Sequence, residues 1–351
     1  MCGAAQRCIV SRVLVAMSGG VDSAVSAALM KEQGHDVTGV TLKLWGGPQD
    51  QGCCSVSDVD DARRVAQQLD IDHFVFNYGE EFDRHVVSPY VDAHAAGLTP
   101  NPCIECNRHI KFDALVSRAK KLGFDFVATG HHARIMETDR GLRLARGVDD
   151  DKDQSYVLYM LTAQDLSMLR FPVGEMTKSE VRELAHHQGL RSAAKPDSQD
   201  VCFITASEGR TSFLSDRLDL HTADVVDVEG NDLGTIDAVE LVTIGQRRGL
   251  NLGGNADRTY AVHVDVPSRR VVVGSAQDLL SEQVQLADHV WADKPYIGPV
   301  QVQISAHGNQ AAGSLTANGN VQWVDAHRKV APGQAVVFYI DDLVIGGATA
   351  I

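Results

Sequence analysis

A glycine-rich stretch near the start of the chain, residues 17–23, has the residue types of a phosphate-binding loop. It follows an apolar run at 13–16, typical of a buried parallel strand, and it precedes apolar residues at helical spacing that end near Gly34. Glycines let backbone N–H groups approach a phosphate, and a helix N-terminus adds unpaired donors and a positive dipole. The stretch lacks the Gly-Lys-Ser/Thr of a Walker A motif. It therefore predicts an anion site of another kind, with a glycine turn that binds no ligand as the alternative.

Cysteines are the second feature that could do chemistry. Cys103 and Cys106 form a CxxC motif in a segment flanked by prolines, which predicts a loop, and Cys202 follows much later. An isolated CxxC could be half of a zinc site, a redox pair or part of an iron–sulfur site. The adjacent pair Cys53-Cys54 is poorly spaced to complete a four-cysteine zinc site.

Apolar strand-like runs alternate with amphipathic helical patterns over the first two hundred residues. These runs cover 37–42, 73–76 and 126–129 in addition to 13–16. Such alternation predicts a doubly wound α/β fold with a parallel sheet, in which ligands bind at the carboxyl ends of the strands. The glycine loop, a loop at Trp45 and the turn Gly130-His131 all fall at such ends. We therefore expect these three segments to meet.

The residue pattern changes past about residue 210, where short Val-, Thr- and Ile-rich runs alternate with turn residues. A chain of 351 residues is also too long for one ordinary core. We expect three domains: a parallel α/β catalytic domain at 1–209, a small, mainly β central domain at 210–283, and a C-terminal β-barrel at 284–351.

Composition limits the classes of function. The formal net charge is −14, and none of the three segments is basic overall, so any nucleic acid must be held by local patches and hydrogen bonds. The sequence contains no run of about 18 apolar residues, so it predicts no membrane helix. Residues 1–11 lack the apolar core of a signal peptide. We expect a cytoplasmic protein with no membrane partner, in which cysteines act as thiols or ligands.

Six motifs in the same order resemble the tRNA-specific 2-thiouridylase family. They lie at 18–23, 99–107, 128–131, 152–156, 202–204 and 245–250. The first also resembles the pyrophosphate-binding loop of ATP pyrophosphatases, which split ATP into AMP and pyrophosphate. The family replaces the 2-oxygen of the wobble uridine of certain tRNAs by sulfur, through an adenylated base. The resemblance therefore implies ATP, Mg²⁺, tRNA and a sulfur donor such as a cysteine desulfurase or sulfur-relay protein.

The same resemblance implies roles for individual residues. Cys202 would carry a persulfide, Cys106 would act as nucleophile or resolving thiol, and Asp22 would lie near the magnesium ion. The implied nucleotide contacts are Ala16, Met17, Ser18, Gly19, Gly20, Val21, Asp22, Ser23, Leu42 and Gly130. The implied tRNA contacts are Asn101, Pro102 and Cys103 at the target base, and His131, Lys152, Asp153, Gln154 and Gln334 elsewhere. His131 could instead be a hydrogen-bonding residue behind the site.

One departure from the family pattern opens a second route for sulfur. Many members have Asp where this chain has Cys103, so Cys103, Cys106 and Cys202 offer three soft ligands. Three cysteines could hold a [4Fe–4S] cluster whose fourth iron binds the sulfide to be transferred. The persulfide and cluster routes both stay open at this point.

Two other functions remain as alternatives. An amidating ligase of the GMP-synthetase type would use the same ATP chemistry, but it would leave Cys106 and Cys202 without roles. A non-catalytic nucleotide- or RNA-binding module would bind tRNA without turnover.

Overall fold

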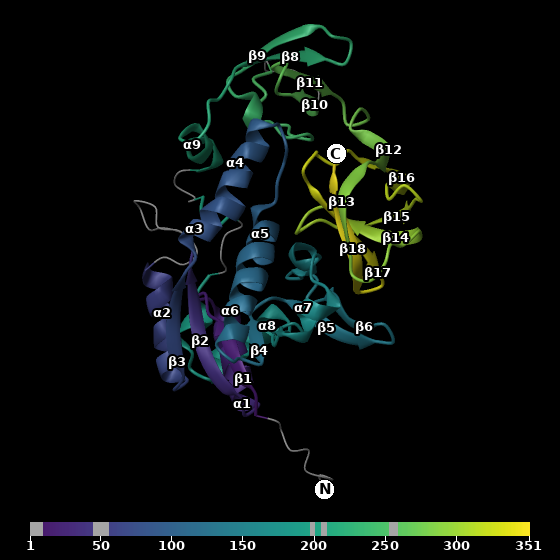
Figure 1. Ribbon diagram of the computed structural model, residues 1–351. Helices are drawn as coiled ribbons and strands as arrows, with labels where there is room; N and C mark the ends of the chain where they lie inside the picture. Colours follow the sequence, from purple (N-terminus) through teal and green to yellow (C-terminus); the bar gives the residue numbers. More distant parts are fainter. Residues whose placement is uncertain (1–9, 45–55, 197–200, 205–208, 253–258) are drawn as a thin grey trace. The chain divides into compact units, whose positions relative to one another are not determined.

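The computed structural model describes residues 10–44, 56–196, 201–204, 209–252 and 259–351 (Figure 1). The predicted loop at Trp45 and the pair Cys53-Cys54 lie outside these residues. The chain divides into two compact units, one of residues 1–85 with 104–205 and the other of residues 86–103 with 206–351. None of the described helices is long and apolar enough to cross a membrane.

The first unit is built on a parallel sheet with the strand order β3-β2-β1-β4-β7. Its strands are β1 (Arg12–Ala16), β2 (Asp36–Lys43), β3 (Asp72–Asn77), β4 (Phe126–Thr129) and β7 (Leu169–Arg170). Each of these pairs is parallel, and Val13, Leu14 and Val15 of the central strand are fully buried. This burial on both faces explains why the central strand β1 reads as a continuous apolar run. The predicted doubly wound α/β domain is confirmed.

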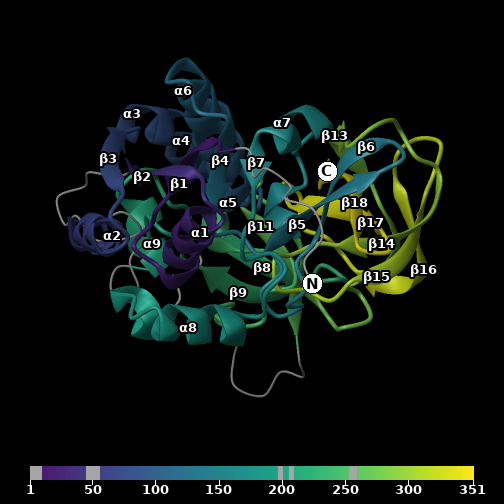
Figure 2. The same ribbon diagram turned by 90° about the horizontal axis from the view of Figure 1, so that it is seen from below.

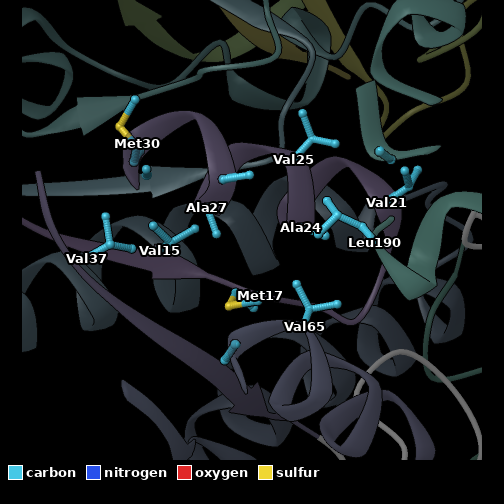
Figure 3. Packing of buried hydrophobic residues seen from close by; sticks show 14 of the residues in the cluster. Val15, Met17, Val21, Ala24, Val25, Ala27, Met30, Val37, Val65 and Leu190 are labelled. Carbon is cyan, nitrogen blue, oxygen red and sulfur yellow. The ribbon is translucent and has the colours of Figure 1, made fainter. Parts of the chain in front are cut away.

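Helices cover both faces of this sheet, with α1 and α2 on one face and α6 on the other (Figure 2). The helices of this unit include α1 (Val21–Glu32), α2 (Val56–Gln68), α3 (Gly79–Phe82), α6 (Leu115–Lys121), α7 (Ala163–Ser167), α8 (Lys178–His187) and the 3₁₀ turns η3 (Ser155–Leu158) and η4 (Arg191–Ala194). A hairpin of β5 (Ala133–Thr138) and β6 (Gly141–Arg146) also belongs to it. Val15 of β1, Ala24 and Val25 of α1 and Val65 of α2 share one buried cluster (Figure 3). The small side chain of Ala24 lets α1 pack closely, which fixes the loop before it.

The CxxC segment was predicted to be a loop, and that prediction is wrong. Helix α5 (Pro102–Glu105) runs directly into a π-helix, η2 (Cys106–Ala114), and then into α6. The Asn101 side chain accepts a hydrogen bond from the Cys103 N–H at 3.0 Å, as an N-cap residue does. Pro102 then occupies the first helical position, where proline is favoured because no N–H is needed. The proline that reads as a loop signal in the sequence therefore starts a helix.

The second unit contains a small β-rich part and several helices. Strands β8 (Ala223–Asp227), β9 (Asp232–Ile236), β10 (Tyr260–Asp265) and β11 (Arg270–Gly274) form a sheet in the order β10-β11-β8-β9. The accompanying helices are α4 (Ser88–Ala95), α9 (Gly209–Ser215) and η5 (Val239–Leu241), and η1 (Asp83–Val87) precedes α4. Val225, Ala261 and Val271 lie in the core of this part. The predicted small, mainly β central domain is confirmed.

The last strands form the C-terminal β-barrel domain. They are β12 (Leu280–Val284), β13 (Leu286–Trp291), β14 (Gly298–Gln303), β15 (Ala311–Leu315), β16 (Val321–Arg328), β17 (Ala335–Ile340) and β18 (Leu343–Ala350). Their pairings β12-β16-β15-β14-β17-β18 and β13-β18 are all antiparallel. Val302, Trp323 and Phe338 fill the interior. These short strands separated by turns match the sequence pattern from which a barrel was predicted.

Candidate active site

The loop between β1 and α1 has the backbone of an anion site. Gly20 is the N-cap of α1, has an extended backbone and contributes no side-chain cap, and the Ala24 N–H makes the first helical bond to the Gly20 carbonyl at 3.2 Å. The N–H groups before Ala24 therefore have no carbonyl within the helix to bind. The Ser23 hydroxyl accepts a hydrogen bond from the Ser18 N–H at 3.2 Å and donates to the Gly20 carbonyl at 3.0 Å. These two bonds close the loop on itself ahead of the first turn of α1.

Two glycines permit close approaches that no other residue would allow. Gly19 has a φ of +75°, and a Cβ there would lie 2.6 Å from the Asp58 carbonyl oxygen of α2. A Cβ on Gly130, just after β4, would lie 2.6 Å from the Ser23 nitrogen. The end of β4 therefore rests on the first turn of α1. The glycine loop and the Gly130 turn meet at the carboxyl ends of the strands, as the sequence predicts.

Asp22, in the first turn of α1, is held by two basic side chains. Lys178 Nζ donates to both carboxylate oxygens, Oδ1 and Oδ2, at 2.8 Å each, and His132 Nε2 donates to Oδ1 at 3.1 Å. Burial alone would raise the pKa of Asp22, but the hydrogen bonds from His132 and Lys178 outweigh it and lower the pKa. Asp22 is therefore a carboxylate at neutral pH. Neither His132 nor Lys178 was predicted from the sequence to be a partner of Asp22.

The predicted contacts Ala16, Met17 and Leu42 hold the strands at the edge of the loop. Ala16 ends β1, and the Met17 N–H donates to the Val40 carbonyl at 2.8 Å. The Thr41 hydroxyl donates to the Met17 carbonyl, also at 2.8 Å, while the side chain of Leu42 is buried on β2. These contacts fix the point where the chain leaves the sheet.

His131 lies inside the first unit. Its Nδ1 is 2.7 Å from the Thr129 hydroxyl, and its ring packs against Phe112 of η2 and Phe171, with centroids 5.8 and 5.9 Å away. Burial, together with the positive charges of Lys111 and His132, lowers the pKa of His131 well below its ordinary value. A neutral buried ring of this kind fits the alternative role, a hydrogen-bonding residue behind the site.

The predicted tRNA contacts at 152–154 differ in exposure. Lys152 is exposed, whereas Asp153 is buried and accepts hydrogen bonds from the Gly147 N–H at 2.9 Å and the Ser155 hydroxyl at 2.8 Å. Gln154 Oε1 accepts from the His132 N–H at 2.9 Å. Asp153 and Gln154 thus shape the chain around His132, and Lys152 is the member of the three whose side chain faces solvent.

Cys106 and Cys202 lie in the first unit, whereas Cys103, in helix α5, belongs to the second. Cys106, the first residue of η2, is buried, and Cys103 and Cys202 are half-buried. Beside Cys202, the buried ring of Phe203 packs edge-on against Phe82 of α3, with centroids 5.7 Å apart. Helix α3 in turn packs against η2. The segments bearing Cys106 and Cys202 are therefore both anchored to α3.

In the second unit, Asn101 and Gln334 belong to neighbouring segments. The Thr99 N–H donates to the Pro332 carbonyl at 2.7 Å, and a Cβ on Gly333 would lie 2.9 Å from Leu98 Cβ. The Gln334 carbonyl accepts from the Ala350 N–H at 2.9 Å, which ties this turn to the barrel. Two predicted groups of tRNA contacts therefore lie side by side within this unit.

Comparison with known proteins identifies the three domains. Residues 11–206 match the tRNA methyl transferase HUP domain, residues 211–275 the tRNA methyl transferase PRC-barrel domain, and residues 281–350 the aminomethyltransferase β-barrel domain. These matches place the chain in a class of tRNA-modifying proteins that combine a parallel α/β domain with two β domains.

Relatives that span nearly the whole chain narrow this class. The tRNA-specific 2-thiouridylase MnmA of Roseiflexus sp. (strain RS-1) is 45% identical and covers 96% of this chain and 98% of its own. The MnmA proteins of Chloroflexus aggregans and Clostridium perfringens (strain 13 / Type A) are 45% and 42% identical, each over 96% of this chain and 97% of their own. The chain belongs to the tRNA-specific 2-thiouridylase family.

Proposed function

We propose that this chain is an enzyme that uses ATP to replace the 2-oxygen of the wobble uridine of tRNA by sulfur. One observation carries the proposal: in a member of this family, a single compact unit combines the anion-binding loop at 18–23 with the thiols of Cys106 and Cys202. ATP activation and sulfur delivery need these two kinds of group. An amidating ligase would need the loop alone.

In the proposed first step, the uridine 2-oxygen attacks the α-phosphorus of ATP, and pyrophosphate leaves with the electron pair of the broken P–O bond. The N–H groups at the start of α1 would bind the departing pyrophosphate. Magnesium prefers one or two carboxylates plus phosphate oxygens, so Asp22 fits as the protein ligand. The ion would neutralise phosphate charge while this chain orients ATP.

In the second step, the outer sulfur of a Cys202 persulfide attacks C2 of the adenylated uridine, and AMP leaves with the former 2-oxygen. The uridine is then joined to Cys202 through a disulfide. The Cys106 thiolate attacks the Cys202 sulfur, which forms a Cys106–Cys202 disulfide and releases the thiolated uridine. A dithiol reductant must reduce that disulfide, and a persulfide donor must reload Cys202 before the next turnover.

The alternative route needs Cys103, Cys106 and Cys202 to bind a [4Fe–4S] cluster together. Within the described part of the chain, no group of three His, Cys, Asp or Glu side chains is placed so as to hold a metal ion. We therefore derive no step through a cluster. In a Cys103→Asp variant, the persulfide route predicts thiolation close to the wild-type rate; loss of that activity, with iron in the anaerobically purified wild-type protein, would favour the cluster.

We further propose that tRNA is held by local contacts, since the net charge of −14 gives no overall attraction for nucleic acid. Asn101, Pro102 and Cys103 would face the target base, and Lys152 and Gln334 would touch tRNA elsewhere. A cysteine desulfurase or sulfur-relay protein would supply the sulfur, in the cytoplasm.

Pyrophosphate release from ATP, with and without bulk tRNA, tests this function. We expect release that depends on tRNA and is lost in Asp22→Ala. Release that is independent of tRNA would favour an amidating ligase, and tight tRNA binding without turnover would favour a binding module.

A further inference from the structure

We propose that Lys178 is a pyrophosphate-binding residue of the adenylation site, held on Asp22 until ATP arrives. When ATP binds with its magnesium ion, the Lys178 ammonium turns from the Asp22 carboxylate to the phosphate oxygens. The inference rests on the proposed ATP-dependent function and adds to it a residue that lies outside the loop and outside the six sequence motifs.

The backbone of Lys178 is fixed from both sides. Lys178 is the first residue of α8, directly after Thr177, which forms a capping box with Glu180. The Lys178 N–H donates to Asp149 Oδ2 at 2.7 Å. Further along α8, Val181 belongs to the same buried cluster as the residues of α1. This packing places the start of α8 over the first turn of α1.

The contact between Lys178 and Asp22 is not an ordinary surface ion pair. Nζ lies 2.8 Å from both carboxylate oxygens, and the two side chains are only 13% and 28% exposed. Water screens such a pair less than an exposed pair. The Lys178 ammonium therefore lies beside the first turn of α1, where a phosphate would bind.

Charge explains why this lysine would move to a phosphate. A carboxylate in a phosphate-binding loop repels the polyphosphate chain unless a cation lies between them. Before ATP arrives, Lys178 supplies that cation. With ATP bound, the Asp22 oxygens would hold the magnesium ion, and Lys178 would be available to the phosphates. Lysine carries a compact charge with three donors on a flexible four-carbon stem, so it can reorient without movement of its backbone.

His132 makes this exchange possible without loss of the Asp22 orientation. Its Nε2 donates to Asp22 Oδ1 at 3.1 Å, and its side chain is 4% exposed. The His132 N–H is itself bound to Gln154 Oε1 at 2.9 Å. Asp22 therefore keeps one fixed partner after Lys178 leaves it.

Calorimetric titration without tRNA, in buffer containing Mg²⁺, tests the inference with ATP, inorganic pyrophosphate and AMP as separate ligands. Since one charge-assisted hydrogen bond is lost, we expect Lys178→Met to weaken ATP and pyrophosphate binding by about 10- to 100-fold. AMP affinity should stay within about twofold, since Lys178 would contact only the departing phosphates. Lys178→Arg should retain part of the affinity for pyrophosphate, and Lys120→Met, on the exposed side of α6, is the matched control.

A second pair of variants separates phosphate binding from support of Asp22. In an Asp22→Asn background, where no carboxylate needs neutralising, the added Lys178→Met change should still weaken pyrophosphate binding. If it has no effect there, or if AMP affinity falls as much as pyrophosphate affinity, Lys178 has only a structural role and the inference is overturned. A wild-type protein that fails to bind ATP would overturn the proposed function itself, whereas normal wild-type binding with an unchanged Lys178→Met variant would overturn this inference alone.

Discussion

The two steps of the proposed reaction use regions that are built in different ways. The loop at 18–23 joins two regular elements, β1 and α1, and Gly130, His132 and Lys178 brace it from distant parts of the sequence. The thiols of Cys106 and Cys202 lie on irregular backbone, at the start of a π-helix and in a turn respectively. Stabilising a departing pyrophosphate requires donors fixed in advance. A π-helical segment is a common local departure at functional sites. We infer that activation and sulfur delivery can be lost separately.

The largest expected effect comes from the thiols. Cys106→Ser or Cys202→Ser should abolish thiolation, because a hydroxyl can neither carry the sulfur in place of Cys202 nor attack the Cys202–uridine disulfide in place of Cys106. Pyrophosphate release that depends on tRNA should persist in a single-turnover assay, because the loop is unchanged. Thiolation can be followed by mass spectrometry of digested tRNA. If either variant also loses pyrophosphate release, the two regions do not act separately.

Shortening the side chain that anchors Cys202 should have a smaller effect in the same direction. Phe203 packs on Phe82, so Phe203→Ala leaves a cavity that costs about 3 kcal/mol of local stability. We expect thiolation to fall about tenfold, which corresponds to part of that free energy, with little change in pyrophosphate release. Phe203→Leu, which fills most of the cavity, is the control. Equal losses in both assays would show that Phe203 supports the loop as well.

Glycine substitutions in the loop should instead impair ATP binding and pyrophosphate release. Gly19→Ala adds a Cβ 2.6 Å from the Asp58 carbonyl at a φ of +75°, so ATP affinity and pyrophosphate release should fall. Gly34→Ala is a matched control, because its φ is +83° but nothing lies within 4 Å of its Cβ. Its backbone strain should lower the free energy of unfolding by about 1 kcal/mol, measured by thermal unfolding, without a change in ATP affinity. Normal ATP binding by Gly19→Ala would contradict the proposed fit of loop and α2.

The smallest effect concerns pH, at a buried histidine of the first unit. His131 follows Gly130 in the chain and packs on Phe112 of η2. Burial, with the charges of Lys111 and His132, lowers its pKa in the folded protein, so its contribution to stability is complete above the ordinary value near 6.5. That contribution is lost as the pH falls below 6.5 towards the folded pKa.

Thermal unfolding at pH 7.5 and pH 5.5 measures this effect. The melting temperature of the wild type should fall more on acidification than that of His131→Gln, whose side chain can bind the Thr129 hydroxyl without titrating. The same drop in both proteins would mean that protonation of other groups dominates.

The sequence was sufficient for the sheet and the loop but not for what surrounds them. Val13, Leu14 and Val15 are fully buried in the central strand, so the sequence there is a continuous apolar run. Gly19 has a positive φ, a conformation that favours glycine. The partners of Asp22 left no such local signal. His132 and Lys178 lie 110 and 156 residues away in sequence, and only packing of distant elements brings them to the carboxylate.

The CxxC segment shows a different limit of sequence reasoning. Pro102 is compatible both with a loop and with the first turn of a helix, and the Asn101 cap decides between them. The π-helix η2 that follows was not predicted from the sequence either.

The fate of the uridine 2-oxygen tests the central claim most directly. With tRNA that carries ¹⁸O at C2 of the wobble uridine, mass spectrometry of the products would locate the heavy oxygen after one turnover. Activation of the carbonyl by adenylation predicts that it appears in AMP. AMP without the label, together with thiolated tRNA, would contradict adenylation of the base.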